Sequence, residues 1–172
     1  MSDLTLRFAG PEDMSSVLEL VRELAEYERA AEEVTVTVEQ LVEDGFQQHL
    51  FRVILAESAG EVAGMALYYP RYSTWKGRTL HLEDLVVKQA YRRHGVGRQL
   101  FEAIIHEARR VGAKRLEWNV LDWNEPALRF YEQFDAELDR DWFLGRLREG
   151  QLVAHVFEEP VEIHGSNADT GA

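Results

Sequence analysis

The stretch from Leu80 to Val111 constrains the fold more than any other part of this 172-residue chain. Its first eight residues, 80–87, are rich in aliphatic and β-branched side chains, which favours a strand. From Arg98 onward, apolar residues recur at the spacing of one helix face: Leu100, Phe101, Ile104, Ile105, Ala108 and Val111. Gly95 and Gly97 stand between the two elements. The sequence therefore predicts a strand, a tight glycine turn and a helix, in that order.

The glycine turn is a candidate binding site for a pyrophosphate group. Because glycine has no side chain, the free backbone N–H groups at the start of the helix can approach phosphate oxygens. Four cationic side chains surround the turn, namely Lys88, Arg92, Arg93 and Arg98. Neither the Gly-Lys-Ser/Thr ending of a nucleotide P-loop nor the third glycine of a dinucleotide fold is present. On this local pattern alone, a plain turn without a ligand is an equally good interpretation.

Composition narrows the possible functions. The 31 acidic and 19 basic side chains give a formal net charge of −12, which argues against a nucleic-acid-binding protein. The absence of cysteine excludes a thiol nucleophile, so an acyl transfer would be direct or use another nucleophile. The six histidines lack the spacing of a metal site, and we expect no metal. With no signal peptide and no 18-residue apolar run, we expect no membrane partner and a cytoplasmic location.

The chain length suits one domain, which we place at residues 1–158, followed by a mobile tail at residues 159–172. Hydrophobic periodicity and turn residues predict the remaining elements. These are a strand at 4–8, helices at 10–25 and 37–48, a hairpin at 51–57 and 62–69, a strand at 115–121, a short helix capped by Asn124, and a closing hairpin at 142–147 and 152–157.

This order of elements resembles the fold of the GNAT N-acetyltransferases. The glycine turn is similar to that family's Gln/Arg-x-x-Gly-x-Gly/Ala signature at Arg92, Gly95 and Gly97. Leu82-Glu83-Asp84 and Trp123-Asn124-Glu125-Pro126 resemble the diamine (spermidine/spermine) acetyltransferase branch, and Tyr72 to Arg78 resembles its relatives that acetylate thialysine. The similarity implies an α/β (α+β) fold, with a mixed, mostly antiparallel sheet of about seven strands and about four flanking helices.

The resemblance also implies acetyl-CoA as the co-substrate. By this comparison, the glycine turn binds the pyrophosphate, the backbone of residues 85–87 binds the thioester oxygen, and residues 124–127 contact the pantetheine arm. The cofactor-binding residues are thus predicted to be Leu85, Val86, Val87, Arg92, Arg93, His94, Gly95, Val96, Gly97, Arg98, Asn124, Pro126, Ala127 and Tyr131.

Acetylation of an amine requires a base, because an alkylammonium ion with a pKa near 10.4 must lose a proton before it can attack. Glu83 is the candidate base, acting through water. The alternative is that Glu83 is only a strand-end carboxylate paired with an arginine. Asp84 would face the opposite way on a regular strand. His81 shares the strand face of Glu83 and is a candidate proton shuttle. The resemblance makes Tyr131 the general acid for the departing thiolate. It places the amine substrate against Tyr27, Glu28, Trp75, Glu83, Asp84, Glu117, Trp118 and Asn119.

The expected function is acetyl transfer to a small cationic amine, either a diamine or a thialysine-like or lysine-like amino acid. Ser73 stands where the diamine branch places an aspartate, and Lys76 follows closely, so amines that carry their own carboxylate are favoured. The branch also implies a homodimer. The chain departs from the branch at Asp135, which replaces a glycine, in the missing basic residues of 132–134, and in a shortened loop at 139–142. Acetylation of protein lysines or N-termini, and a non-catalytic acetyl-CoA-binding module, remain alternatives.

Overall fold

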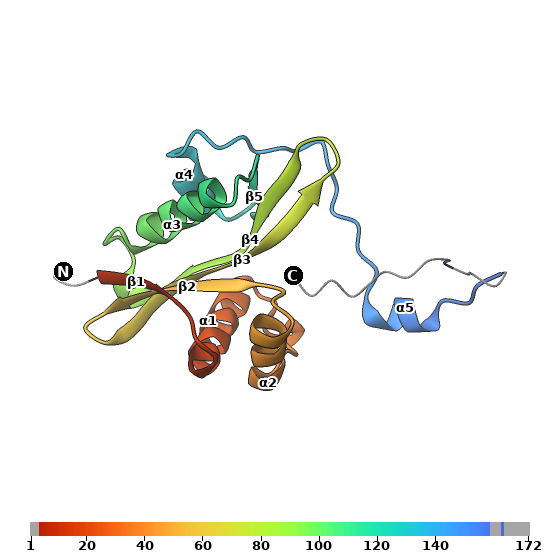
Figure 1. The fold of residues 1–172 in the computed structure, drawn as a ribbon, viewed down its shortest axis with the longest axis horizontal. Coiled ribbons are helices and arrows are strands. Elements are labelled where there is room, and N and C mark those ends of the chain that lie inside the picture. The colour runs from red at the N-terminus through yellow and green to blue at the C-terminus, as the bar shows by residue number, and fades with distance from the viewer. Residues whose placement is uncertain (1–3, 159–162, 164–172) are drawn as a thin grey trace. The chain divides into compact units, whose positions relative to one another are not determined.

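A five-stranded sheet forms the centre of the first 119 residues (Figure 1). The computed structural model describes residues 4–158 and 163. The strands lie side by side in the order β1 (Leu4–Phe8), β2 (Arg52–Ser58), β3 (Glu61–Ser73), β4 (Gly77–Val87) and β5 (Leu116–Trp118). The first four pair antiparallel and the last two pair parallel, so the mixed, mostly antiparallel sheet is confirmed. The predicted number of about seven strands was wrong, since the described residues form five.

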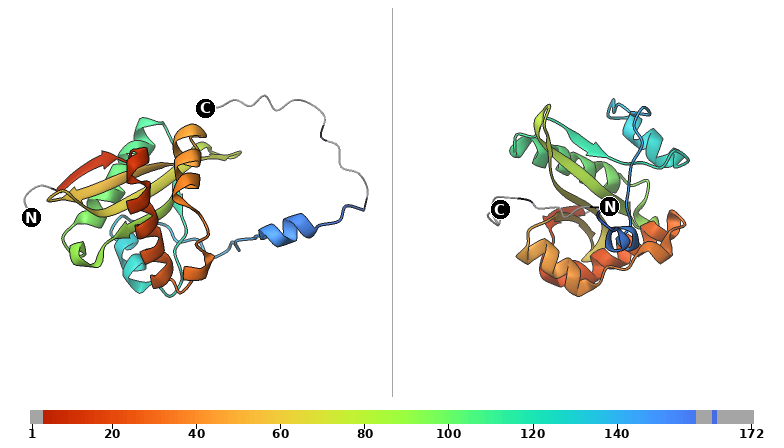
Figure 2. Two further views of the ribbon diagram at one scale, coloured as in Figure 1. Left: turned by 90° about the horizontal axis from the view of Figure 1, so that it is seen from below. Right: turned by 90° about the vertical axis from the view of Figure 1, so that its right-hand side faces the viewer.

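Helices cover both faces of this sheet (Figures 1 and 2). α1 (Met14–Tyr27) and α2 (Val38–Val42) lie on one face, and α3 (Val96–Arg110) lies on the other. Short helical turns complete this part of the chain: η1 (Pro11–Asp13), η2 (Ala31–Glu33), η3 (Glu43–Gln47, a π-helical turn) and η4 (Gln89–Tyr91).

The face beneath α1 and α2 buries an apolar core. This core contains Met14, Val17, Leu18, Leu20, Leu41, Val53, Leu55, Met65, Leu67 and Val86. Full burial of one such side chain stabilises a protein by about 1.5–3 kcal/mol. On the opposite face, the Tyr68 hydroxyl donates a hydrogen bond of 3.0 Å to the buried Glu107 of α3. Arg110 pairs with the same carboxylate at 2.8 Å, so this charge on α3 is compensated.

Several local sequence signals are confirmed. Thr37 and Gln40 form the predicted capping box, with the Gln40 N–H donating to Thr37 Oγ1 at 3.2 Å and the Thr37 N–H donating to Gln40 Oε1 at 2.9 Å. The helix that follows is shorter than expected, because α2 gives way to a π-helical turn at Glu43. Gly112 lies just past α3 with φ of 69°, in the left-handed region that suits a helix end.

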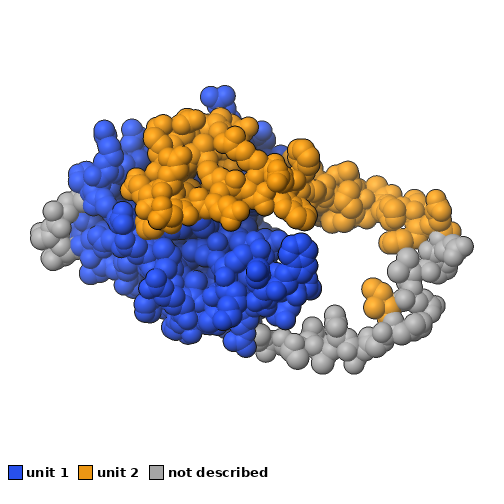
Figure 3. Space-filling model, turned by 90° about the horizontal axis from the view of Figure 1, so that it is seen from above, with its two compact units in different colours: residues 1–119, 171–172 blue, residues 120–170 orange. Residues whose placement is uncertain are grey.

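The described residues from Val120 to Glu158 belong to a second compact unit (Figure 3). It contains α4 (Glu125–Glu132), capped by Asn124 as predicted, and α5 (Glu149–Ala154). The single domain at 1–158 stays a prediction, and the expected tail lies outside the described residues except for Ile163.

The predicted closing hairpin was wrong. Residues 142–148 have no regular structure, and residues 149–154 form α5 instead of a strand. The Arg148 N–H donates to Gln151 Oε1 at 3.0 Å, and the Gln151 N–H donates to the Arg148 carbonyl at 2.8 Å, which are contacts of a helix start. An isolated two-stranded hairpin is marginal in water, so local helix-starting contacts decide the conformation.

Candidate active site

The strand β4 loses one of its neighbours halfway along its length. β5 pairs with β4 only from Leu80 to Leu82, and among the described residues no strand pairs with that edge beyond Leu82. The other edge stays paired with β3 as far as Val87. The backbone of residues 85–87, predicted to hold the thioester oxygen, therefore lies where β4 and β5 have parted.

A β-bulge in the same strand determines which side chains face the substrate side. Leu67 pairs with Asp84 and Tyr68 pairs with Leu82, which leaves Glu83 as an extra residue. Leu67 and Tyr69 share a face of β3, the face that α1 covers, and paired residues share a face of the sheet. Asp84 therefore lies on the same face as the α1-side core. The expectation that Asp84 faces away was wrong, because the strand is not regular.

Glu83 is held by two aromatic side chains that face each other across β3 and β4. The Tyr69 hydroxyl donates a hydrogen bond of 2.9 Å to Glu83 Oε2, and His81 Nε2 lies 3.6 Å from the same oxygen. The Tyr69 and His81 rings are 5.1 Å apart between centroids. Tyr69 was not among the predicted site residues; the signal for it is its position as the cross-strand partner of His81 in the sheet.

The electrostatics of this face single out Asp84. Burial raises its pKa to about 7, and the nearby charges of Glu83 and Glu28 act in the same direction. Burial also raises the pKa of Glu28, at the end of α1. A carboxyl group with a pKa near neutrality suits a general base, so Asp84 joins Glu83 as a candidate. Glu28, Glu83 and Asp84 are thus brought together, as predicted for an amine pocket.

The predicted substrate-binding residues on β5 and on the β3–β4 turn have other surroundings than Glu28, Glu83 and Asp84. Glu117 is within 3.8 Å of Arg71 and 3.5 Å of Arg115, so part of its charge is already compensated. Trp118 packs edge-to-face on Phe101 of α3 at 5.2 Å, which places it on the face opposite Glu117.

Trp75 and Asn119 are both exposed. Trp75 is 81% exposed at the tip of the β3–β4 hairpin. Ser73, where this turn starts, is five residues from Tyr68 at the bulge, or about 17 Å along the strand. The structure therefore does not bring Trp75 together with the acidic group.

The glycine turn has the predicted strand-turn-helix geometry. Arg93 and Gly95 have φ of 63° and 82°, and Gly95 directly precedes α3. The first hydrogen bond of the helix joins the Gln99 N–H to the Gly95 carbonyl at 3.1 Å. The N–H groups of Val96 and Gly97, which precede it, have no partner within the helix and can face an anion. The predicted side chains Arg92, Arg93, His94 and Arg98 are all exposed around this turn.

Arg92 connects the turn to α1. Its Nε donates to the Val87 carbonyl at 2.9 Å, and its guanidinium carbon lies 5.8 Å from the centre of the Tyr27 ring. An open cleft of about 520 Å³ lies here, lined by Glu23, Glu26, Tyr27, Lys88, Gln89 and Arg92. The predicted amine residue Tyr27 and the predicted phosphate residue Arg92 therefore line one cleft.

The remaining predicted residues belong to the second unit. Asn124 Oδ1 accepts the Ala127 N–H at 3.3 Å, and Pro126 lies in the first turn of α4. Tyr131 is 7% exposed, and burial raises its pKa to about 12. Its ring packs edge-to-face on Phe130 at 5.1 Å. At neutral pH this phenol stays protonated and can donate a hydrogen bond.

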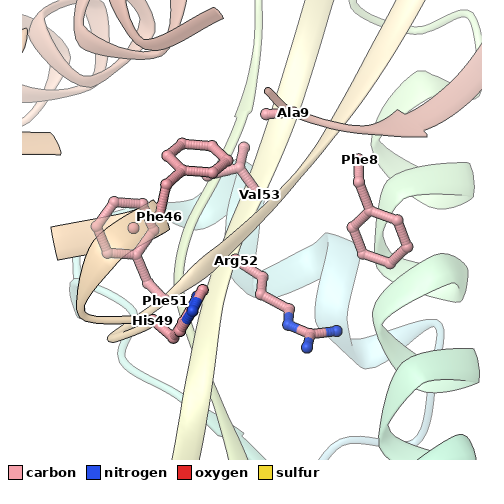
Figure 4. Close-up of a pocket in the computed structure, with 8 residues that line it drawn as sticks. Phe8, Ala9, Phe46, His49, Phe51, Arg52 and Val53 are labelled. Carbon is pink, nitrogen blue, oxygen red and sulfur yellow. The ribbon is translucent and has the colours of Figure 1, made fainter. Parts of the chain in front are cut away.

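A smaller pocket of about 220 Å³ lies elsewhere, between β1, β2 and η3 (Figure 4). Phe8, Phe46, Phe51 and Arg52 line it, and it contains none of the predicted site residues.

Within the described ranges, no group of three or more His, Asp or Glu side chains is placed to hold a metal ion. Among the helices described, none is long and apolar enough to cross a membrane.

Comparisons with known proteins find a matching family and several relatives. The model of the acetyltransferase (GNAT) family matches residues 14–136. Thialysine N-epsilon-acetyltransferase of Bos taurus is 38% identical over 146 residues, which cover 80% of this chain and 86% of that protein. The enzyme of the same name from Caenorhabditis elegans is 36% identical over 150 residues, covering 86% and 93%. A solved integron cassette protein from the V. cholerae mobile metagenome shares the fold, with a TM-score of 0.73 and 23% identity over 89% of this chain and 96% of that one.

Proposed function

Because the chain belongs to the acetyltransferase (GNAT) family, we propose that it transfers the acetyl group of acetyl-CoA directly to the primary amine of a small, thialysine-like or lysine-like substrate. Family membership makes the protein an enzyme of the transferase class, as the sequence predicted. The observation that carries the proposal is the group of Glu28, Glu83 and Asp84 on one face of the sheet. Three carboxyl groups in one place suit a substrate that carries an ammonium group.

Acetyl-CoA fits the features of the first unit. The positive φ of Gly95, the N–H groups of Val96 and Gly97 at the start of α3 and the exposed arginines around the turn suit a pyrophosphate. Among the described residues no strand pairs with the outer edge of residues 85–87, so its backbone can hydrogen-bond a carbonyl oxygen. When bound, this co-substrate supplies the acetyl group as a thioester. Asn124, Pro126 and Ala127 are the proposed contacts of its pantetheine arm.

The proton transfers are assigned to side chains of this protein. Glu83 and Asp84 bind the ammonium group, and one of the two carboxylates accepts its proton. The raised pKa of Asp84, about 7, brings this carboxyl group closer to the amine, whose pKa is near 10.4. Tyr69 holds Glu83 in place through its hydroxyl. Tyr131 carries a proton at its hydroxyl and donates it, or a hydrogen bond, to the departing sulfur. A cytoplasmic location stays a prediction from the sequence.

We expect thialysine to be acetylated with a higher kcat/KM than spermidine. The Ser73 hydroxyl accepts hydrogen bonds from the Trp75 and Lys76 N–H groups at 3.3 and 3.2 Å. The turn therefore has no carboxylate to bind the second ammonium group of a polyamine, and the positive charge of Lys76 lies nearby. Because the turn is exposed and lies about 17 Å along the strand from the bulge, solvent screens this difference, and we expect it to be worth about 1 kcal/mol or less. Release of CoA, measured with a thiol reagent over a panel of amines and lysine peptides, tests the proposal.

The variant Ser73→Asp/Lys76→Ile should shift the preference toward spermidine by up to about fivefold. A wild type that prefers spermidine, or a double variant without a shift, would contradict this specificity. Turnover of peptides but not of free amines would favour the protein acetyltransferase instead. Binding of acetyl-CoA without any turnover would favour the non-catalytic module.

A homodimer is the proposed assembly. The described residues after α4 expose a series of large apolar side chains: Trp142, Phe143, Leu144, Leu147, Leu152, Val153, Val156 and Phe157 are each 60% to 98% exposed. Exposed apolar surface of this extent marks an interaction site in a folded protein. Light scattering should therefore give twice the chain mass of 19.8 kDa. The variant Trp142→Ser/Phe143→Ser should shift the mass toward the monomer, and a monomeric wild type at working concentration would refute the dimer.

A further inference from the structure

Gly64 of β3 lies so close to the backbone of β4 that a side chain does not fit between them. It pairs with Val87, and a Cβ atom at this position would lie 2.5 Å from the Val86 carbonyl oxygen and 3.2 Å from Val87 Cα. The Leu100 side chain of α3, at 3.3 Å, closes the remaining space. The two nearest atoms belong to the backbone, so they cannot rotate away as the end of a side chain can. A methyl group at residue 64 would therefore push this part of β4 away from β3.

The hydrogen bonds at the end of β4 show which way its peptide groups point. The Lys88 N–H donates to the Ala63 carbonyl of β3 at 2.9 Å. The Val87 carbonyl belongs to the same peptide group, and it accepts from Arg92 Nε at 2.9 Å rather than from β3. Because the C=O and N–H of a planar trans peptide point in opposite directions, this group points its N–H toward β3 and its C=O away from it.

The preceding peptide group, which joins Val86 and Val87, points the opposite way. Its carbonyl oxygen faces Gly64 on β3, so its N–H, on Val87, faces the other edge of β4. Beyond Leu82, no strand among the described residues pairs with that edge. The Val87 N–H is therefore one of the backbone donors that the edge of residues 85–87 offers to a carbonyl oxygen.

We propose that Gly64 is a positioning residue that aims the Val87 N–H at a carbonyl oxygen of the acetylated pantetheine arm, an inference that rests on the proposed function. The Val86 carbonyl and the Val87 N–H are opposite ends of one rigid plane, so the contact at Gly64 fixes the direction of the donor. A methyl group at residue 64 would tilt this plane, and a hydrogen bond weakens steeply as its angle becomes less linear. Gly64 thus acts on acetyl-CoA without touching it.

The variant Gly64→Ala tests this role by calorimetric titration with two probes, acetyl-CoA and the phosphoadenosine diphosphate end of CoA, which lacks the arm. We expect the affinity for acetyl-CoA to fall about fivefold or more, and the affinity for phosphoadenosine diphosphate to change less than about twofold. The kcat for thialysine should fall about tenfold or more. The matched control is Gly45→Ala, whose methyl group meets the Phe51 ring at 3.0 Å, away from the site. It should lower the melting temperature and keep both affinities and kcat.

A measurement on the wild type does not depend on the folding of a variant. Amide hydrogen exchange followed by NMR should show that acetyl-CoA slows exchange of the Val87 N–H about tenfold or more, whereas phosphoadenosine diphosphate does not. The Lys88 N–H, bonded to Ala63 in the free protein, is the internal reference and should exchange slowly throughout.

Three results overturn the role of Gly64: a Val87 N–H that acetyl-CoA leaves unprotected, equal losses of affinity for both probes in Gly64→Ala, or wild-type affinity and kcat in that variant. A wild type that does not bind acetyl-CoA overturns the proposed function and this inference together.

Discussion

Tyr131→Phe is expected to lower kcat by about 100-fold or more, with little change in acetyl-CoA affinity. The hydroxyl is a proton donor that burial keeps protonated, with a pKa raised to about 12. Phenylalanine preserves the ring and its edge-to-face contact with Phe130, so the variant removes only the donor. Without this donor, the thiolate leaves without a proton or a hydrogen bond. Single-turnover kinetics, which isolate the chemical step, give the required comparison.

Tyr68→Phe is the matched control for this variant. Tyr68 is also a buried tyrosine with a pKa raised to about 12, but its hydroxyl donates to Glu107 on the α3 side of the sheet. Removal of that hydrogen bond should cost about 1 kcal/mol of stability and leave kcat unchanged. A Tyr131→Phe enzyme with near wild-type kcat, measured where chemistry limits the rate, would remove Tyr131 from the mechanism.

Gly95→Val should abolish measurable acetyl-CoA binding while the sheet and helices stay folded. Gly95 has φ of 82°, in a region that a β-branched residue adopts only with strain, and its position opens onto free space. A valine side chain would occupy that space and block the approach of phosphate to the N–H groups of α3. Calorimetric titration with acetyl-CoA measures the loss.

The control for backbone strain lies at the other end of the same helix. Gly112 has φ of 69° and also faces open space, so Gly112→Val imposes a similar strain without touching the turn. We expect it to lower stability and keep acetyl-CoA affinity. Micromolar affinity retained by Gly95→Val, or equal losses in both variants, would end the assignment of this turn to the cofactor.

The elements that the sequence predicted well are those with a local cause. The glycine turn before α3, the Thr37 capping box and the Asn124 cap depend on residues within a few positions of one another. The same is true of the β2–β3 hairpin, whose turn residues Ala59 and Gly60 both have positive φ. Family membership and the resemblance to thialysine acetyltransferases were likewise predicted from such motifs and are confirmed.

The bulge at Glu83 could not be predicted in the same way. Alternation in Leu82-Glu83-Asp84 is compatible with a regular strand, and only the pairing with β3 shows that one residue is extra. That single residue changes the face of Asp84 and brings Tyr69 onto Glu83, across the hairpin. The closing hairpin failed for a different reason, because local helix-starting contacts between Arg148 and Gln151 form α5 where a strand was predicted.

The burial of Asp84 makes the stability of the folded protein depend on pH. Its carboxyl pKa rises from 3.8 to about 7 on folding, so between these values the folded chain holds a proton that the unfolded chain releases. The free energy of unfolding therefore falls as pH rises from about 4 to about 7, by an amount on the order of 1–3 kcal/mol after allowance for partial exposure. Conformational stability is highest where this carboxyl is neutral, and its ability to attract an ammonium ion is greatest where it is ionised. A bound cation stabilises the ionised carboxylate and so restores part of the lost free energy of unfolding. A cationic substrate should therefore raise the melting temperature of the enzyme most strongly above neutral pH.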